Sequence, residues 1–123
     1  AYQLAVVTDD AQAGVTQVVR GSDLLSSTPR QIWLYRLFGF EPPHFVHIPL
    51  LCDVDGRRLS KRDEDLDLGL LRERFTPEQV IGALAFAAHL TDRAEPASVR
   101  ELVQDLDWSR IPRHELYLPP MFR

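Results

Sequence analysis

Cysteine is scarce in this sequence, and its scarcity narrows the classes of protein that fit. The 123 residues contain a single cysteine, Cys52, which excludes an intrachain disulfide and offers none of the paired spacings that hold structural zinc. His44 and His47 lie three residues apart with no third ligand type nearby, so we expect no metal site there either. Such a chain suits a reducing cytoplasm.

Long apolar runs and an excess of basic residues are also lacking. No stretch approaches the roughly 18 apolar residues of a membrane span, and no signal-peptide pattern is present, so we expect a cytoplasmic protein without membrane association. Lysine and arginine number 14 against 18 acidic residues, and the net charge of −4 argues against sequence-independent coating of nucleic acid. The remaining composition is that of an ordinary globular domain and names no function.

The first half of the chain alternates strand and helix signals. Residues 1–10 form an apolar run that ends at Asp9 and Asp10, and residues 14–21 are rich in β-branched side chains, so both stretches are typical of strands. Residues 45–51 form a third strand-like run. Neighbouring carboxylates on a strand point to opposite faces, so Asp9 and Asp10 are not expected to share a metal ion; a turn or capping role is the simpler interpretation.

A helix is predicted between the second and third of these strands. Thr28 is the expected N-cap, Pro29 occupies the first helical position, and Gly39 is the expected stop. Its expected apolar face consists of Ile32, Trp33, Tyr35, Leu37 and Phe38. The order strand, helix, strand favours a parallel α/β unit.

The second half changes to helical patterns. Thr76 and Gln79 form a capping-box pattern that begins one helix, and residues 96–106 form a shorter amphipathic helix. Residues 107–123 are rich in proline and aromatic side chains and are expected to pack as irregular structure. The organisation is half of an α/β domain followed by a small helical domain.

A basic loop stands out against the overall negative charge. Asp55-Gly56 is a turn signal, and the sequence that follows, "RRLSKR", places Arg58, Lys61 and Arg62 on a loop. Cationic side chains there would stabilise the charge that moves to a leaving pyrophosphate when a triphosphate reacts. A charged loop is also what a solvated turn looks like, so the charges alone leave both interpretations open.

The sequence of this loop resembles a signature of a known protein family. "RLSKR", residues 58–62, resembles the KMSKS loop of class I aminoacyl-tRNA synthetases in the "LSKR" form of the glutamyl group. The segment from "YQLAVVTDD" to "LFGFEPP" and the string "HIPLL" resemble, in order and spacing, what precedes that loop in glutamyl-tRNA synthetases. The helical remainder, with "DWSRIP", looks more like the glutamyl-Q tRNA(Asp) synthetases. Two departures are "SKRDED" where many relatives have "SKRHG", and Arg58 where lysine is more usual.

The resemblance implies a fold and a set of site residues. It implies an α/β fold in which residues 1–62 are the second half of a Rossmann-like nucleotide-binding domain and residues 63–123 a small helical, stem-contact-like domain. Lys61 would be catalytic, and Arg58, Ser60 and Lys61 would bind ATP, which enters with Mg²⁺ as a substrate. His47, within "HIPLL", would line the adenine pocket through its backbone.

Two further residues would bind glutamate. The resemblance assigns Tyr2 and Arg20 to the glutamate substrate, and a guanidinium does pair with a carboxylate through two parallel hydrogen bonds. Without the resemblance, Tyr2 is more simply a core aromatic, whereas Arg20 beside Gly21 ends a strand, where α/β sheets place ligand-binding groups. Asp23 matches an acidic position near the amino-acid and tRNA-end pocket.

Two family features are not found in these residues. They are the HIGH-type motif and the Cys and His cluster that holds zinc in many glutamyl-Q enzymes. Because the chain also opens on an apolar run, we expect Ala1 to be internal and the chain to be the C-terminal part of a larger, monomeric ligase. On that view this part alone is inactive, and zinc belongs to the preceding part.

The nature of the RNA acceptor is a further expectation. The favoured partner besides glutamate is tRNA(Asp), modified at its queuosine, because the chain ends about 60 residues after Lys61 without room for an anticodon-binding domain. The alternatives are a glutamyl-tRNA synthetase that charges the terminus of tRNA(Glu), and a stand-alone module that binds RNA or a protein.

Overall fold

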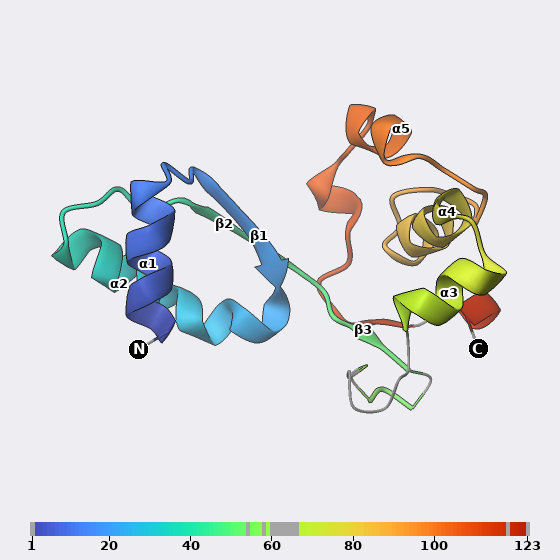
Figure 1. The fold of residues 1–123 in the computed structure, drawn as a ribbon, viewed down its shortest axis with the longest axis horizontal. Coiled ribbons are helices and arrows are strands. Elements are labelled where there is room, and N and C mark those ends of the chain that lie inside the picture. Colours follow the sequence, from blue (N-terminus) through green and yellow to red (C-terminus); the bar gives the residue numbers. More distant parts are fainter. Residues whose placement is uncertain (1, 54, 58, 60–66, 118, 123) are drawn as a thin grey trace. The chain divides into compact units, whose positions relative to one another are not determined.

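The structure is a computed structural model that describes residues 2–53, 55–57, 59, 67–117 and 119–122 (Figure 1). Contacts divide the chain into two compact units, Ala1–Ile48 and Pro49–Arg123. The boundary expected from the sequence, between residues 62 and 63, lies outside the described residues. Helices and strands alternate in the first unit and helices dominate the second, so the α/β class is confirmed.

The first unit is built on a pair of parallel strands. Strand β1 (Gln17–Gly21) pairs with β2 (His44–Ile48), and the chain between them forms the 3-10 helix η1 (Ser22–Ser27) and helix α2 (Thr28–Leu37). The predicted order of strand, helix and parallel strand is therefore confirmed. The register places Arg20 beside His47.

The prediction of a strand at the start of the chain is wrong. Residues Tyr2–Gln12 form helix α1, which packs against α2. A short apolar run does not by itself distinguish a strand from a helix, and here Gln3 and Val7 lie on one helical face, with Val7 fully buried. Asp9 and Asp10 consequently lie on the C-terminal half of a helix, and the argument from strand geometry does not apply to them.

Helix α2 differs from its prediction in two ways. Its N-cap is Ser27, because η1 runs directly into α2 and leaves the Thr28 hydroxyl free of a capping role. Its buried face consists of Thr28, Gln31 and Tyr35, whereas the expected apolar residues Trp33 and Leu37 are each 59% exposed. The same shift of the helix start places Pro29 at the second helical position, where the first was predicted, whereas Gly39, at φ +72°, follows the helix end as predicted.

The second unit contains three α-helices within the described residues. They are α3 (Leu68–Arg74), α4 (Pro77–Ala87) and α5 (Val99–Gln104). The predicted capping box is present on α4, where the Thr76 hydroxyl accepts from Gln79 N and the Gln79 side chain accepts from Thr76 N. Leu71, Ala83 and Phe122 form the core, with the rings of Phe75 and Phe122 edge to face at 5.5 Å.

The C-terminal tail is more regular than expected. Its residues Leu116–Tyr117 form strand β4, which pairs in parallel with β3 (Leu51–Cys52), and two further 3-10 helices, η2 (Trp108–Arg110) and η3 (Pro120–Phe122), flank β4. This pairing joins segments far apart in the sequence, so no local pattern announces it. In the described residues no helix combines the length and apolar character needed to cross a bilayer.

The turn before the basic loop forms as predicted. Gly56 has φ +78°, and the Asp53 carboxylate accepts from the backbone N–H groups of Asp55 (3.0 Å) and Arg57 (2.8 Å). The Arg57 side chain returns to the same carboxylate at 3.0 Å. The turn is thus held by one aspartate, and it leads directly to Arg58, which lies outside the described residues.

Candidate functional site

Arg20 lies at the end of β1, beside Gly21, and its guanidinium is enclosed by neighbouring side chains. Nη1 donates to Gln31 Oε1 at 2.7 Å, Nη2 donates to Thr28 Oγ1 at 2.7 Å, and Nε donates to His47 Nε2 at 3.3 Å. Cζ lies 4.8 Å from the centre of the Phe45 ring, within the range of a cation–π contact. We call Arg20, Thr28, Gln31, Phe45 and His47 the Arg20 cluster.

The elements around Arg20 explain how the cluster forms. Thr28 and Gln31 are three residues apart on α2, so they lie on the same helical face, and both are buried. Phe45 and His47 are two residues apart on β2, so they lie on the same face of the strand, and the parallel register pairs His47 with Arg20. Among the described residues, one turn of α2 and the strand β2 therefore supply the partners of the guanidinium.

His47 contributes an uncharged acceptor to the cluster. Burial, and secondarily the positive charge of Arg20, lower the pKa of His47 below its usual value. Because Nε2 accepts from Arg20 Nε, the ring proton of the neutral form belongs on Nδ1. The Thr28 hydroxyl, 2.9 Å from Nε2, then donates to it.

The positive charge of the Arg20 guanidinium is not neutralised by the described side chains around it. Its hydrogen-bond partners are an amide, a hydroxyl and a neutral imidazole, and no carboxylate among the described residues forms an ion pair with it. An arginine has five N–H donors, so two remain for a further acceptor. A carboxylate is the acceptor that gains most from such a group, because the hydrogen bonds would then be charge-assisted on both sides.

The cluster extends to helix α1 through a second amide. Gln31 Nε2 donates to Gln3 Oε1 at 2.6 Å, and Gln3 Nε2 donates to Ser27 Oγ at 3.3 Å. Tyr2, the residue before Gln3, is 64% exposed. The structure thus places Tyr2 on a helix tied to the Arg20 cluster, although no hydrogen bond joins Tyr2 to Arg20 in the described part of the chain.

Of the other predicted site residues, the structure describes Asp23 alone. Asp23 is exposed in η1. Arg58, Ser60 and Lys61 lie outside the described residues, so their assignment to ATP stays a prediction.

Sequence reasoning missed the side chains of Gln3, Thr28, Gln31 and His47. Thr28 had been given a capping role and His47 a backbone role. A detectable signal was the helical spacing of Thr28, Gln31 and Tyr35, which places two polar residues on one helical face with an aromatic residue. The contribution of His47 depends on the strand register, and that of Gln3 on recognising α1 as a helix.

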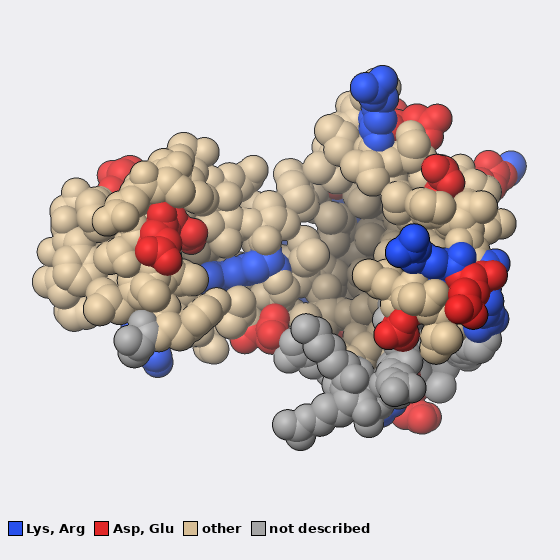
Figure 2. All heavy atoms as spheres, viewed as in Figure 1, with Lys and Arg blue, Asp and Glu red and all other residues tan. Residues whose placement is uncertain are grey.

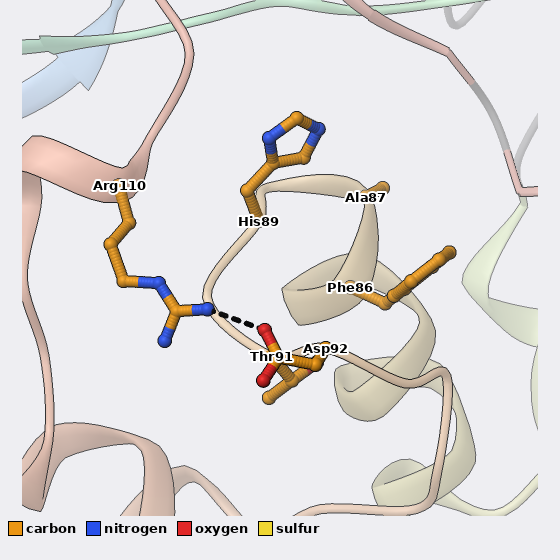
Figure 3. Close-up of a pocket in the computed structure, with 6 residues that line it drawn as sticks. All are labelled: Phe86, Ala87, His89, Thr91, Asp92 and Arg110. Atoms are coloured by element: carbon orange, nitrogen blue, oxygen red, sulfur yellow. Dashed lines mark hydrogen bonds and ion pairs between the residues drawn. The ribbon is translucent and has the colours of Figure 1, made fainter.

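The second unit contains a hollow of its own. It has a volume of about 480 Å³ and is lined by Phe86, Ala87, His89, Thr91, Asp92 and Arg110 (Figure 3). Arg110 Nη2 contacts Asp92 Oδ1 at 2.9 Å, which joins η2 to the loop after α4. Figure 2 shows acidic and basic side chains interspersed among the described residues on the visible face of this unit.

Comparison with known proteins identifies the family. The model of the catalytic domain of class I tRNA synthetases (E and Q) matches residues 1–110. The chain is 51% identical to a glutamyl-Q tRNA(Asp) synthetase of Symbiobacterium thermophilum and 46% identical to one of Nitratidesulfovibrio vulgaris. The alignments cover 96% and 97% of this chain but 37% of each relative, so the chain spans little more than a third of their length.

A solved structure agrees with this assignment. A glutamate tRNA ligase from Elizabethkingia meningosepticum, in complex with its amino acid, matches 99% of this chain and 28% of its own, with a TM-score of 0.80 and 25% identity. The resemblance based on "RLSKR" and its flanking strings is thereby confirmed at the level of the family. The chain belongs to the class I tRNA synthetase (E and Q) catalytic-domain family.

Proposed function

We propose that this chain is part of a ligase that activates glutamate with ATP and transfers the glutamyl group to RNA. The observation that carries the proposal is the Arg20 cluster: a charged guanidinium at a strand end, surrounded by neutral acceptors. Such a group offers a binding site for a carboxylate. The names of the relatives, which specify glutamate or its tRNA product, support the identity of that carboxylate.

Arg20 and Tyr2 form the glutamate-binding part of the proposal. The N–H groups of Arg20 that are not used within the cluster bind a substrate carboxylate, and the exposed Tyr2 donates a further hydrogen bond from its hydroxyl. The three internal hydrogen bonds hold the planar guanidinium in one orientation before substrate arrives. Preorganisation of this kind reduces the entropy lost on binding.

The basic loop supplies the second part. The glutamate α-carboxylate attacks the α-phosphorus of ATP; a new O–P bond forms, the bond to the β-phosphate breaks, and pyrophosphate leaves with its electrons. Lys61, with Arg58 and Ser60, stabilises the charge that develops on this leaving group, while Mg²⁺ enters with ATP. The product, glutamyl-adenylate, then transfers its glutamyl group to RNA: a bond forms between the glutamyl carbonyl carbon and the RNA acceptor, the bond from that carbon to the phosphate oxygen breaks, and AMP leaves.

The queuosine base of tRNA(Asp) is the proposed acceptor. Support comes from the two relatives named above, both glutamyl-Q tRNA(Asp) synthetases at 46% identity or more. The alternative acceptor is the terminus of tRNA(Glu), and the solved glutamate tRNA ligase favours keeping it in the test. Glutamylation assays on queuosine-containing tRNA(Asp) and on tRNA(Glu) distinguish the two.

The activation step is tested in the full-length protein that carries this sequence. Glutamate-dependent exchange of pyrophosphate into ATP is expected to fall about 100- to 1,000-fold in Lys61→Ala, because a stabilising charge at the leaving group is lost. Arg20→Lys is expected to raise the KM for glutamate about 10- to 100-fold, since lysine cannot reproduce the planar fork. Arg30→Lys, an exposed position on α2, serves as the matched control.

The proposal predicts that the two variants affect different steps: Lys61→Ala the activation chemistry and Arg20→Lys the binding of glutamate. Lys61→Ala should retain glutamate binding, and Arg20→Lys should retain its KM for ATP. Unchanged exchange activity in Lys61→Ala would remove the assigned role of the loop. An unchanged KM for glutamate in Arg20→Lys would remove the proposed glutamate site.

A further inference from the structure

The amide of Gln31 lies at the centre of a directed chain of hydrogen bonds. Arginine has donors alone, so Gln31 must present Oε1 to Arg20 and Nε2 to Gln3. Gln3 must in turn present Oε1 to Gln31 and Nε2 to Ser27. The orientation of every amide in this chain is therefore fixed by the charge of Arg20.

We propose that Gln31 is a positioning residue for glutamate, which orients the Arg20 guanidinium and links it to the first turn of α1, where Tyr2 lies. The inference rests on the proposed function and deepens it, because it names the residue that couples the two sides of the glutamate site. Gln31 does not touch the substrate. It acts through Arg20 on one side and through Gln3 on the other.

Burial shows why an amide suits this position. Gln31 is 1% exposed, and a buried amide is costly unless both its donor and its acceptor are satisfied. Here both ends are used, at 2.7 Å toward Arg20 and at 2.6 Å toward Gln3. A leucine of similar size would fill the volume but would leave an N–H of Arg20 and the Gln3 carbonyl without these partners.

Charge explains why a carboxylate does not suit it. A glutamate in place of Gln31 would still accept from Arg20, but it would neutralise the guanidinium that the substrate carboxylate requires. It would also place a carboxylate oxygen against Gln3 Oε1, where the amide now donates. The amide satisfies the guanidinium and preserves its charge, which a carboxylate of the same shape cannot do.

The link to α1 couples two elements that are distant in sequence. Gln3 lies 28 residues before Gln31 and contacts both Gln31 and Ser27, so it fixes the first turn of α1 against α2. Tyr2 is the neighbour of Gln3 on that turn. A change at Gln31 should therefore disturb both Arg20 and the backbone that carries Tyr2.

The test uses steady-state exchange kinetics of the full-length protein. Gln31→Glu is expected to raise the KM for glutamate about 10- to 100-fold, in the range of a lost hydrogen bond to a charged group, while the KM for ATP changes less than about twofold. Gln17→Glu adds the same charge at an exposed position of β1 and is the matched control. A role in folding alone would lower the melting temperature without this separation of the two KM values.

Gln3→Met provides an independent test if Gln31→Glu fails to fold. It removes the acceptor of Gln31 Nε2 but leaves the Arg20–Gln31 bond, so the KM for glutamate should rise by a smaller factor of about 3 to 10. Gln31→Leu is measured alone and combined with Gln3→Met; the combined variant should raise the KM for glutamate by less than the product of the two single factors, because both changes break one chain of bonds.

The outcomes separate this inference from the proposed function. If Arg20→Lys raises the KM for glutamate while Gln31→Glu and Gln3→Met leave it unchanged, the positioning role is refuted and the glutamate site stands. If Arg20→Lys has no effect on that KM, the glutamate site itself is refuted, and the positioning role with it.

Discussion

Gly82 on α4 is a position where a single added methyl group should destabilise the second unit. The helix passes so close to the segment before α5 that a Cβ on Gly82 would overlap the carbonyl oxygen of Glu95. The same Cβ would lie 2.8 Å from the Glu95 carbonyl carbon and 3.1 Å from Ala97 N. All three atoms belong to the backbone, so no side-chain rotation can relieve the overlap.

The cost of Gly82→Ala is the balance of two opposing effects. Alanine favours the helix over glycine by about 1 kcal/mol. Overpacking of an interior costs about 1 to 3 kcal/mol and sometimes more, and movement of this segment would also strain the Ala97 N to Glu78 O hydrogen bond of 3.0 Å, whose loss costs about 1 kcal/mol. The net expectation is a loss of about 1 to 3 kcal/mol, or roughly 5 to 20 °C in melting temperature.

Thermal unfolding followed by far-UV circular dichroism measures this effect. Ala87→Gly, at the last residue of the same helix, is the control for helix propensity, and it should lower the free energy of unfolding by at most about 1 kcal/mol, the value for a helix interior. A melting temperature that rises in Gly82→Ala would show that propensity dominates. The close approach of Glu95 to α4 would then be refuted.

Two further predictions concern the first unit. Burial and the charge of Arg20 lower the pKa of His47 in the folded chain, so below about pH 6.5, the usual pKa of histidine, the unfolded chain binds a proton there more readily than the folded chain does. The free energy of unfolding should therefore fall as the pH drops below about 6.5. Denaturant titrations at several pH values should show a weaker dependence on pH in His47→Gln. The buried hydroxyl of Tyr35 has no hydrogen-bond partner among the described residues, so Tyr35→Phe should leave the free energy of unfolding unchanged or raise it by up to about 2 kcal/mol. A loss above about 1 kcal/mol in the same titration would reveal an interaction of that hydroxyl.

The helices of the second unit were predictable because their start signals are local. Thr76 and Gln79 form the capping box that the sequence indicates, and Ser98 and Glu101 form a second one at the start of α5. Each box depends on residues three positions apart, and its energy does not depend on the rest of the fold. The pairing of β3 with β4 was not predictable in this way, because its partners are separated by more than 60 residues.

The errors in the first unit have a different cause. Helix α1 was taken for a strand because its apolar run is too short to reveal a period, and its partner α2 decides the outcome. The assignment of Arg20 to glutamate is a prediction from its place beside Gly21 and from the family resemblance. Its surroundings required the β1–β2 register, which brings His47 to it, and the helical face that carries Thr28 and Gln31.

The buried face of α2, which differs from the predicted one, carries two of the residues that surround Arg20 in the proposed binding site. Hydrophobic periodicity places Trp33 and Leu37 inside, but the structure exposes them and buries Thr28 and Gln31 instead. A helix gains little stability by burying an amide and a hydroxyl in place of large apolar side chains, unless those polar groups have a partner that needs them. Arg20 is that partner, because its guanidinium donates to both the Gln31 amide and the Thr28 hydroxyl. The departure of α2 from its hydrophobic pattern therefore coincides with the charged group that its buried polar side chains contact, which is the observation on which the proposed binding role of Arg20 rests.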